Sequence, residues 1–145
     1  MNVDSTQAVR IIEHAAKKQL LNCPHFQMIA DGYMIANLPF EEKLIGIYSN
    51  EYSSNMPKIY VSVAGIHWKN KDVNQWNRFL YSDILDILCP HKTDDEPSLT
   101  ITLKNGSVVN LDIFGCYGPN NKFKEFTNFY LFLRKAGWAA NQVIS

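Results

Sequence analysis

The sequence predicts a single α+β domain, and three observations carry this prediction. An amphipathic helical pattern opens the chain, alternating apolar and polar residues fill its middle, and a second helical pattern lies near its end. The 145 residues fit one domain, which at this size buries roughly 70% of the surface that its unfolded chain exposes. We therefore expect one domain over residues 1–145 that needs no metal or disulfide to fold.

The first predicted element is an amphipathic helix from about Ser5 to Leu21. Its apolar positions recur at the three- and four-residue steps of a helix: Ala8, Ile11, Ile12, Ala15, Ala16 and Leu20. Asp4 or Ser5 is placed to cap its start. Asn22 and Pro24 end it, because proline disfavours helical backbone in the residue before it.

The middle of the chain predicts antiparallel strands. The period changes to two beyond Pro39, giving strands over residues 44–49, 58–63 and 66–69, with Ala64-Gly65 as a tight turn between the last two. In the second of these strands Ile59, Val61 and Val63 share one face, and Tyr60 and Ser62 share the other. Residues 77–88 predict one further strand, although their spacing also tolerates a helix.

A hairpin and a closing helix complete the predicted order. Leu99, Ile101 and Leu103 alternate with polar residues before Asn105-Gly106, a pair that tolerates the positive φ angles of a two-residue turn. The returning strand runs to Ile113. Apolar residues then recur from Phe123 at helical steps, which predicts a helix that ends near Gly137. Because this helix is apolar on more than one side, we expect it to be covered by other elements or to plug a curved sheet.

These segments resemble, in order, the bacterial pleckstrin-homology-like and GRAM-like domains. The stretches that carry the resemblance lie between Lys43 and Ala136: KIYVSVAGIHWKNKD, FLYSDILDI, LTITLKNGSVVNLDIFG and KFKEFTNFYLFLRKA. The resemblance implies a bent antiparallel sheet, or a partly open barrel, of about seven strands that a C-terminal helix plugs. It divides the domain into an N-terminal helix and extension (residues 1–40), a PH-like core (41–137) and a tail (138–145).

One departure from the family bears on function. Family members that bind phosphoinositides use basic residues around the first strand loop, ending in a Lys-x-Arg pair. Here Lys58 is present, but Tyr60 stands where the Arg would be, and Glu51 adds a negative charge. This argues against headgroup recognition by the usual route. Lys43, Lys58, Lys69 and Lys71 are expected either to gather at one end of the sheet or to form an ordinary solvated rim.

Two Cys-Pro-His triplets, Cys23 to His25 and Cys89 to His91, raise the question of a split zinc site. Paired zinc ligands usually stand two to four residues apart, whereas these leave one residue between them. Both triplets also follow the end of a predicted element, where proline is common. We therefore predict no metal and no cofactor; a metal site would require the four ligands to converge.

The sequence offers no anchor for catalysis. It contains no nucleophile elbow, HExxH helix, phosphate-binding loop or dinucleotide fingerprint. His67 and His14 are expected at the surface, and Cys116 is expected to pack as a small hydrophobe. We therefore predict that the protein is not an enzyme.

Charge and composition bound the partners. Fourteen Lys and Arg residues balance fourteen Asp and Glu residues, so no net positive field attracts nucleic acid, and no nucleic-acid partner is expected. The sequence has no apolar run of membrane-spanning length and no secretory signal. Its three cysteines, an odd number, favour a reducing compartment. The expected location is the cytoplasm.

Aromatic and Met residues in or beside the predicted loops indicate a protein interface. Aromatic and Met side chains are enriched at such interfaces, and an acidic run can face a basic partner. The candidate partner-binding residues are Tyr52, Met56, Lys58, Lys69, Lys71, Trp76, Asp94, Asp95, Glu96 and Tyr117, with Trp138 as a further aromatic. The alternative is that the aromatics lid the ends of the sheet.

The hypothesis from sequence is a cytoplasmic protein-binding module, and within that class a dedicated inhibitor such as an immunity protein that neutralises a toxin. The alternative is a lipid or membrane-surface adaptor of the PH/GRAM type. Neither the partner nor the oligomeric state follows from the residues.

Overall fold

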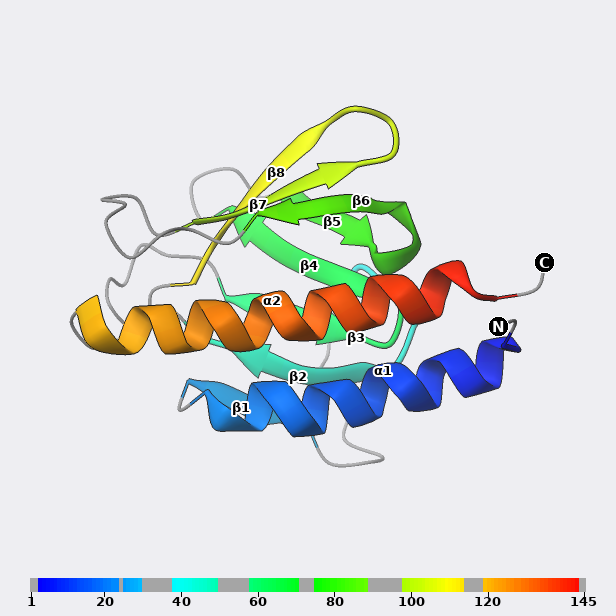
Figure 1. Ribbon diagram of the computed structural model, residues 1–145, viewed down its shortest axis with the longest axis horizontal. Helices are drawn as coiled ribbons and strands as arrows, with labels where there is room; N and C mark the ends of the chain where they lie inside the picture. Colours follow the sequence, from blue (N-terminus) through cyan, green and yellow to red (C-terminus); the bar gives the residue numbers. More distant parts are fainter. Residues whose placement is uncertain are drawn as a thin grey trace.

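The chain forms an α+β structure with its two long helices side by side. The computed structural model describes residues 3–23, 25–29, 38–49, 58–70, 75–88, 98–113 and 119–143, with backbone alone for residues 70, 98 and 119–124. The helices are α1 (Ser5–Gln19) and α2 (Pro119–Asn141). They pack against each other and run in opposite directions across the strands (Figure 1).

The strands form two antiparallel sheets. The first has the order β1 (Phe26–Met28), β2 (Leu44–Tyr48), β3 (Ile59–Ser62), β4 (Gly65–Asn70) and β5 (Gln75–Leu80). The second has the order β6 (Ile84–Leu88), β7 (Ser98–Leu103) and β8 (Val108–Asp112). Within the described ranges no strand pairing closes these sheets into a barrel. The α+β class is confirmed, and β1 is a strand that the sequence pattern did not predict.

The start of α1 confirms the predicted cap. The Asp4 carboxylate accepts a hydrogen bond of 2.7 Å from the Gln7 backbone N–H, and the Gln7 side chain accepts one of 3.1 Å from the Asp4 N–H. This reciprocal arrangement satisfies two backbone donors that the first helical turn would leave unpaired. The helix passes into a short 3₁₀ turn, η1 (Leu20–Asn22), and Cys23 follows with extended backbone.

The predicted hairpin is also confirmed. Strands β7 and β8 pair in register through Ile101 and Val109, and Gly106 in the connecting turn has a φ of 90°. Because that angle lies in the left-handed region, glycine is the residue that adopts it at least cost. Leu99, Ile101, Leu111 and Ile113 are buried, as the alternation predicted.

The prediction of one strand over residues 77–88 is wrong. A 3₁₀ turn, η2 (Tyr81–Asp83), divides this segment into β5 and β6, which belong to different sheets. Tyr81 fixes the turn through two distant contacts: its backbone N–H donates to the Ala64 carbonyl at 3.0 Å, and its hydroxyl donates to the Ser62 carbonyl at 2.7 Å. The chain therefore passes from one sheet to the other at a point where the local sequence pattern predicts one continuous strand.

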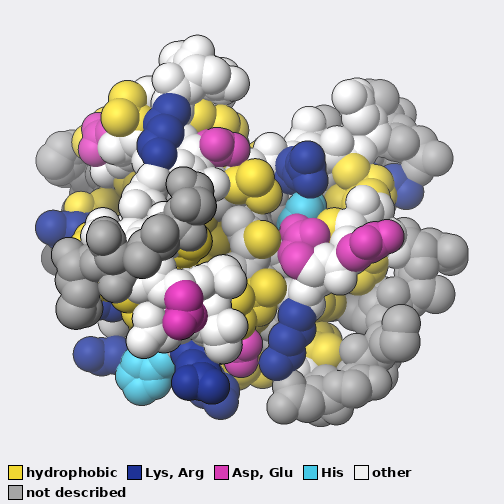
Figure 2. Space-filling view, turned by 90° about the vertical axis from the view of Figure 1, so that its right-hand side faces the viewer, with side chains coloured by type: hydrophobic (Ala, Val, Ile, Leu, Met, Phe, Trp, Pro, Cys, Tyr) yellow, Lys and Arg dark blue, Asp and Glu magenta, His cyan; other side chains and the backbone are white. Residues whose placement is uncertain are grey.

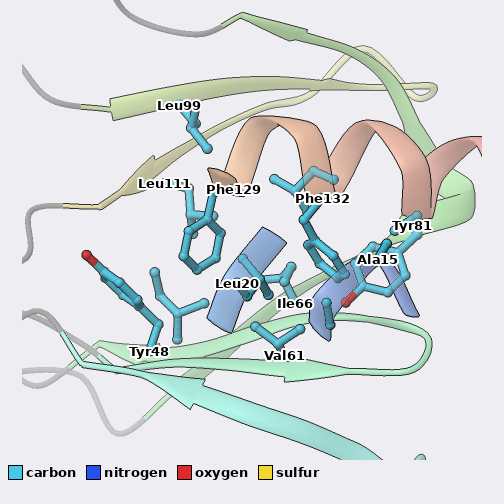
Figure 3. Packing of buried hydrophobic residues seen from close by; sticks show 14 of the residues in the cluster. Ala15, Leu20, Tyr48, Val61, Ile66, Tyr81, Leu99, Leu111, Phe129 and Phe132 are labelled. Atoms are coloured by element: carbon cyan, nitrogen blue, oxygen red, sulfur yellow. The ribbon is translucent and has the colours of Figure 1, made fainter. Parts of the chain in front are cut away.

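Helix α2 supplies the centre of the hydrophobic core. The ring of Phe129 packs edge-on against Tyr48 of β2 with ring centroids 5.0 Å apart, and that of Phe132 packs against Tyr81 at 5.6 Å. Both α2 side chains point toward Val61 and Ile66 and toward residues of α1 (Figure 3). The core cluster thus joins both helices to both sheets.

Helix α2 is longer than predicted. It continues through Gly137 to Asn141, so residues 138–141 of the expected tail are helical. Gly137 is buried against Ile84 and the Tyr81 carbonyl, and this packing outweighs the weak helix propensity of glycine. No helix in the described part of the chain combines the length and the hydropathy needed to cross a membrane.

Candidate functional site

A groove of about 790 Å³ runs between α1 and α2 on the side of the helix pair that faces solvent. We call it the helix groove. Its described lining comes from two helices that are distant in sequence: Arg10, Ile11, His14, Ala15, Lys18 and Gln19 of α1, and Leu131, Arg134, Lys135 and Trp138 of α2.

The α1 rim of the helix groove is a straight row of basic side chains. Arg10, His14 and Lys18 are spaced by four residues, which places them on one side of the helix. All three are exposed. The buried face of α1, formed by residues such as Ile12 and Ala16, points to the core instead.

The α2 rim combines charge with apolar surface. Arg134 and Lys135 are exposed, and Leu131 and Trp138 are 39% and 40% exposed. The Lys135 ammonium lies 4.4 Å from the centroid of the Trp138 ring, in cation–π contact. This rim therefore presents an exposed aromatic ring beside a positive charge.

The charge of the helix groove is not balanced locally. Among the described residues that line it, four carry permanent positive charge and none is acidic. The α1 carboxylate of Glu13 lies outside the helix groove, with Oε2 3.5 Å from Nζ of Lys43. Lys, Arg and His side chains gather over the helix pair, at the lower left of the view along the helices (Figure 2). The neutral total of the chain therefore conceals a basic face.

A second, smaller groove lies on the other side of α2. It has a volume of about 440 Å³ and is lined by β6 and α2. Arg134 and Trp138 line both grooves and so form the ridge between them. Leu85 of β6, which is 65% exposed, lies across the ridge.

The structure separates the lysines expected at one end of the sheet. Ile59 pairs with Trp68, so Lys58 and Lys69 flank the same end of β3 and β4, and both are exposed. Lys43 precedes Leu44, which pairs with Ser62 at the opposite end of β3. Of the two alternatives for these lysines, gathering at one end of the sheet does not hold for Lys43; Lys71 lies outside the described residues.

The remaining candidate partner-binding residues lie in different parts of the structure. Trp76, expected in or beside a loop, lies in β5 and is half-buried, with its ring centroid 5.2 Å from that of Tyr60. Trp138, also expected in a loop, lies in α2 and lines the helix groove. The following candidates lie outside the described residues: Tyr52, Met56, Asp94, Asp95, Glu96 and Tyr117.

The first Cys-Pro-His triplet contributes to the core. Cys23 is 1% exposed, and Nδ1 of His25 lies 2.8 Å from Oε1 of Glu125, itself buried in α2. This pair fastens the segment after η1 to the start of α2. Within the described ranges no group of three or more His, Cys, Asp or Glu side chains is placed to hold a metal. Cys89, His91 and Cys116 lie outside those ranges.

His67, expected at the surface, is buried at 1% exposure, whereas His14 is exposed as predicted. The ring of Phe40 stacks on the His67 ring at a centroid distance of 3.8 Å. Nε2 of His67 lies 2.7 Å from Oε1 of Glu42. Burial is the main cause that lowers the pKa of His67; nearby Arg78 lowers it further, and Glu42 opposes both. Residues of the segment before β2 thus cover the face of β4 that carries His67, which the alternation in the sequence predicts to be polar and exposed.

The same carboxylate reaches a buried serine. Ser62 Oγ accepts hydrogen bonds from the backbone N–H groups of Ala64 and Gly65 and lies 3.2 Å from Oε1 of Glu42. Burial tends to raise the pKa of Glu42, but hydrogen bonds from its own backbone, His67 and Ser62 outweigh this, so the pKa lies below its usual value. Oε1 of Glu42 is thus shared between the Ser62 hydroxyl and the His67 ring, and it links the segment before β2 to the turn between β3 and β4.

Sequence reasoning missed the helix groove because its rims meet only in the folded chain. One signal was available: the closing helix was recognised as apolar on more than one side, and Leu131 and Trp138 are the part left exposed. The second signal was the spacing of Arg10, His14 and Lys18, which recur every four residues.

Comparison with protein-family models, with curated proteins and with solved structures found no significant match.

Proposed function

We propose that this chain is a non-enzymatic protein-binding module, that the helix groove is its contact surface, and that it acts as a dedicated inhibitor, such as an immunity protein that neutralises a toxin. The supporting observation is the group of uncompensated cations beside an exposed tryptophan. Arg and Trp contribute more than most residues to binding energy at protein interfaces. Charge complementarity supports a protein partner with an acidic surface.

The inhibitor interpretation follows from what this surface offers. A dedicated inhibitor needs one charged and partly apolar docking face and no chemistry of its own. Electrostatic attraction between such faces raises the rate of association, which suits a protein that must capture its target quickly. The narrower assignment to toxin immunity rests on this analogy with dedicated inhibitors.

We also infer that the strands and α2 correspond to a PH-like core to which α1 is added. The order of the elements supports this: a sheet that includes β2 to β5, a sheet of β6 to β8 and a C-terminal helix that contacts both. In this arrangement α1 supplies one complete rim of the helix groove. The docking face is thus built from an element outside the family pattern.

The second candidate function is a membrane-surface adaptor. The same cations would attract anionic lipid, and Trp138 is a residue type found at membrane interfaces. The concave shape favours the protein partner, because a flat bilayer contacts the rims and leaves the half-buried Ile11 between them uncovered.

The test is affinity capture with matched charge variants. Tagged wild-type protein, a groove variant (Arg10→Glu with Arg134→Glu) and a sheet variant (Lys58→Glu with Lys69→Glu) are used to capture proteins from lysate of the source cells. Both variants change charge equally, and circular dichroism checks that each is folded. We expect one stoichiometric partner on the wild type and the sheet variant, and at least tenfold less on the groove variant.

The other outcomes contradict the proposal in different ways. A partner lost only by the sheet variant would move the interface to Lys58 and Lys69. If no protein is captured but phosphatidylserine vesicles bind in a salt-sensitive way, the chain is a membrane adaptor. A captured partner that is harmless when expressed alone would exclude the immunity function.

A further inference from the structure

We propose that the element of the partner that fills the helix groove is an acidic amphipathic α-helix, which packs as a third helix against α1 and α2. This inference rests on the proposed function and adds the conformation and charge of the bound segment. Three features of the helix groove support it: the spacing of its rims, the state of its backbone groups and the character of its floor.

The rims repeat at the pitch of a helix. Arg10, His14 and Lys18 are four residues apart on α1, which corresponds to steps of about 6 Å along its axis. On α2, Arg134 and Trp138 are separated by the same interval. A partner helix carrying Glu or Asp at every fourth position presents carboxylates at the same steps, so successive turns meet successive cations.

The backbone of the rims excludes an extended occupant. A strand laid between α1 and α2 would turn its N–H and C=O groups toward two helices whose own backbone groups are consumed internally. Buried backbone groups without partners are costly. A helix satisfies its backbone groups within itself and brings only side chains to the contact.

The floor suits an apolar stripe. Ile11 is half-buried, Ala15 is buried, and Leu131 and Trp138 provide apolar surface on the α2 side. Because Ala15 belongs to the core cluster, the apolar surface open to an occupant comes from Ile11, Leu131 and Trp138. The expected occupant therefore carries Leu or Met along one side and carboxylates on both flanks, which is the helix-in-groove mode of recognition.

The experiment uses three synthetic peptides of about 18 residues, which give a helix of about five turns. The first has a Leu stripe flanked by Glu at four-residue intervals, the second has two central residues replaced by Pro, and the third has Lys in place of Glu. Binding to the full chain is followed by amide NMR shifts and calorimetry. We expect the first peptide to bind at least tenfold more tightly than the others and to shift the amides of residues 10–18 and 131–138.

Matched variants locate the contact. Arg10 and Lys17 are both exposed cations of α1, but only Arg10 lines the helix groove. Arg10→Ala and Trp138→Ala should each weaken binding of the acidic helix several-fold, whereas Lys17→Ala should leave it nearly unchanged. Equal effects of Arg10→Ala and Lys17→Ala would mean that the peptide responds to general charge, which contradicts the proposal.

The remaining outcomes overturn this inference without touching the proposed function. If no peptide binds, or if the Pro-containing peptide binds as tightly as the helical one, the occupant is not an acidic helix. Capture of a protein through Arg10 and Arg134 would still establish the binding module. If the helical peptide binds as expected but no protein is captured, the proposed function is contradicted. The inference that the helix groove binds an acidic helix would then still hold.

Discussion

His67 and Glu42 form a partly buried hydrogen bond in which Nε2 of the imidazole donates to Oε1 of the carboxylate at 2.7 Å. The direction of donation follows from protonation, because the pKa values of both groups are lowered and an ionised carboxylate only accepts. The cluster therefore holds a neutral imidazole against a charged carboxylate, and its stability depends on pH.

The first prediction is that acid destabilises the protein through His67. The unfolded chain protonates this histidine near pH 6.5, while the folded chain resists protonation because its pKa is lowered. Stability conferred by the neutral form should thus be present above about pH 6.5 and decrease below it, by at most about 1.4 kcal/mol per pH unit. Glu42 adds a further loss below its unfolded pKa of about 4.5. Urea unfolding at pH 7.5 and about 5.5 measures the effect.

Two histidine variants identify the responsible group. His67→Gln should be less stable at neutral pH but should lose less stability between the two pH values than the wild type. His14→Gln, which changes an exposed residue, should behave as the wild type. If His67→Gln retains the full pH dependence, another group controls it.

The second prediction concerns the hydroxyl of Tyr81. It is buried and donates a hydrogen bond of 2.7 Å to the Ser62 carbonyl, and burial is the main cause that raises the pKa of Tyr81 well above 10.0. Tyr81→Phe should lower the free energy of unfolding by about 1–2 kcal/mol at neutral pH. Because the unfolded tyrosine ionises first, stability of the wild type should also decrease above pH 10, and this loss should shrink in Tyr81→Phe. Tyr60→Phe, at a half-buried site, is the control; an equal loss there would contradict the assignment.

The third prediction contrasts two glycines. A Cβ at Gly65 would lie 2.3 Å from the Phe79 carbonyl oxygen, a backbone atom of the paired strand β5. Gly65→Ala should therefore cost roughly 1–3 kcal/mol, as overpacking does. A Cβ at Gly137 would lie 3.6 Å from Ile84 Cδ1, an ordinary contact, so Gly137→Ala should raise stability by about 0.5–1 kcal/mol through helix propensity. Chemical denaturation of both variants tests this, and a loss in Gly137→Ala would show that α2 cannot take the methyl group.

The fourth prediction is that the cations of the helix groove lower the free energy of unfolding. Its unbalanced cations repel one another across the rims, so Arg134→Gln should raise stability by a few tenths of a kcal/mol at about 0.01 M salt. The gain should nearly vanish at about 0.3 M salt, where such charges are screened. Lys58→Gln, outside the helix groove, should show a smaller gain at both concentrations. A gain in Arg134→Gln that is independent of salt would exclude repulsion as its cause.

The features that the sequence predicted correctly are those fixed by neighbours along the chain. The Asp4 cap, the period of α1 and the Asn105-Gly106 turn each depend on residues a few positions apart. The division of residues 77–88 depends instead on bonds from Tyr81 to Ala64 and Ser62. No local pattern contains those contacts.

The same distinction explains the candidate site. His67 was expected at the surface because strand alternation cannot reveal that Phe40 covers that face. Trp138 was expected in a loop because Gly137 is a common helix terminator, whereas packing against Ile84 carries the helix past it. The helix groove forms only when α1 packs on α2. The sequence predicts which residues share one side of each helix, but not which sides of the two helices meet.

The bridge between Val3 and Val143, where the Val3 N–H donates to the Gln142 carbonyl at 3.0 Å, makes the fold nearly circular. Both ends lie together beyond the same end of the helix pair (Figure 1). A short linker should therefore join them, and new ends opened at the exposed Asn105-Gly106 turn would leave every described helix and strand intact. Such a permuted chain would start with β8 and finish with β7, and its circular dichroism and peptide binding should match the wild type if the fold depends on packing and not on the order of synthesis.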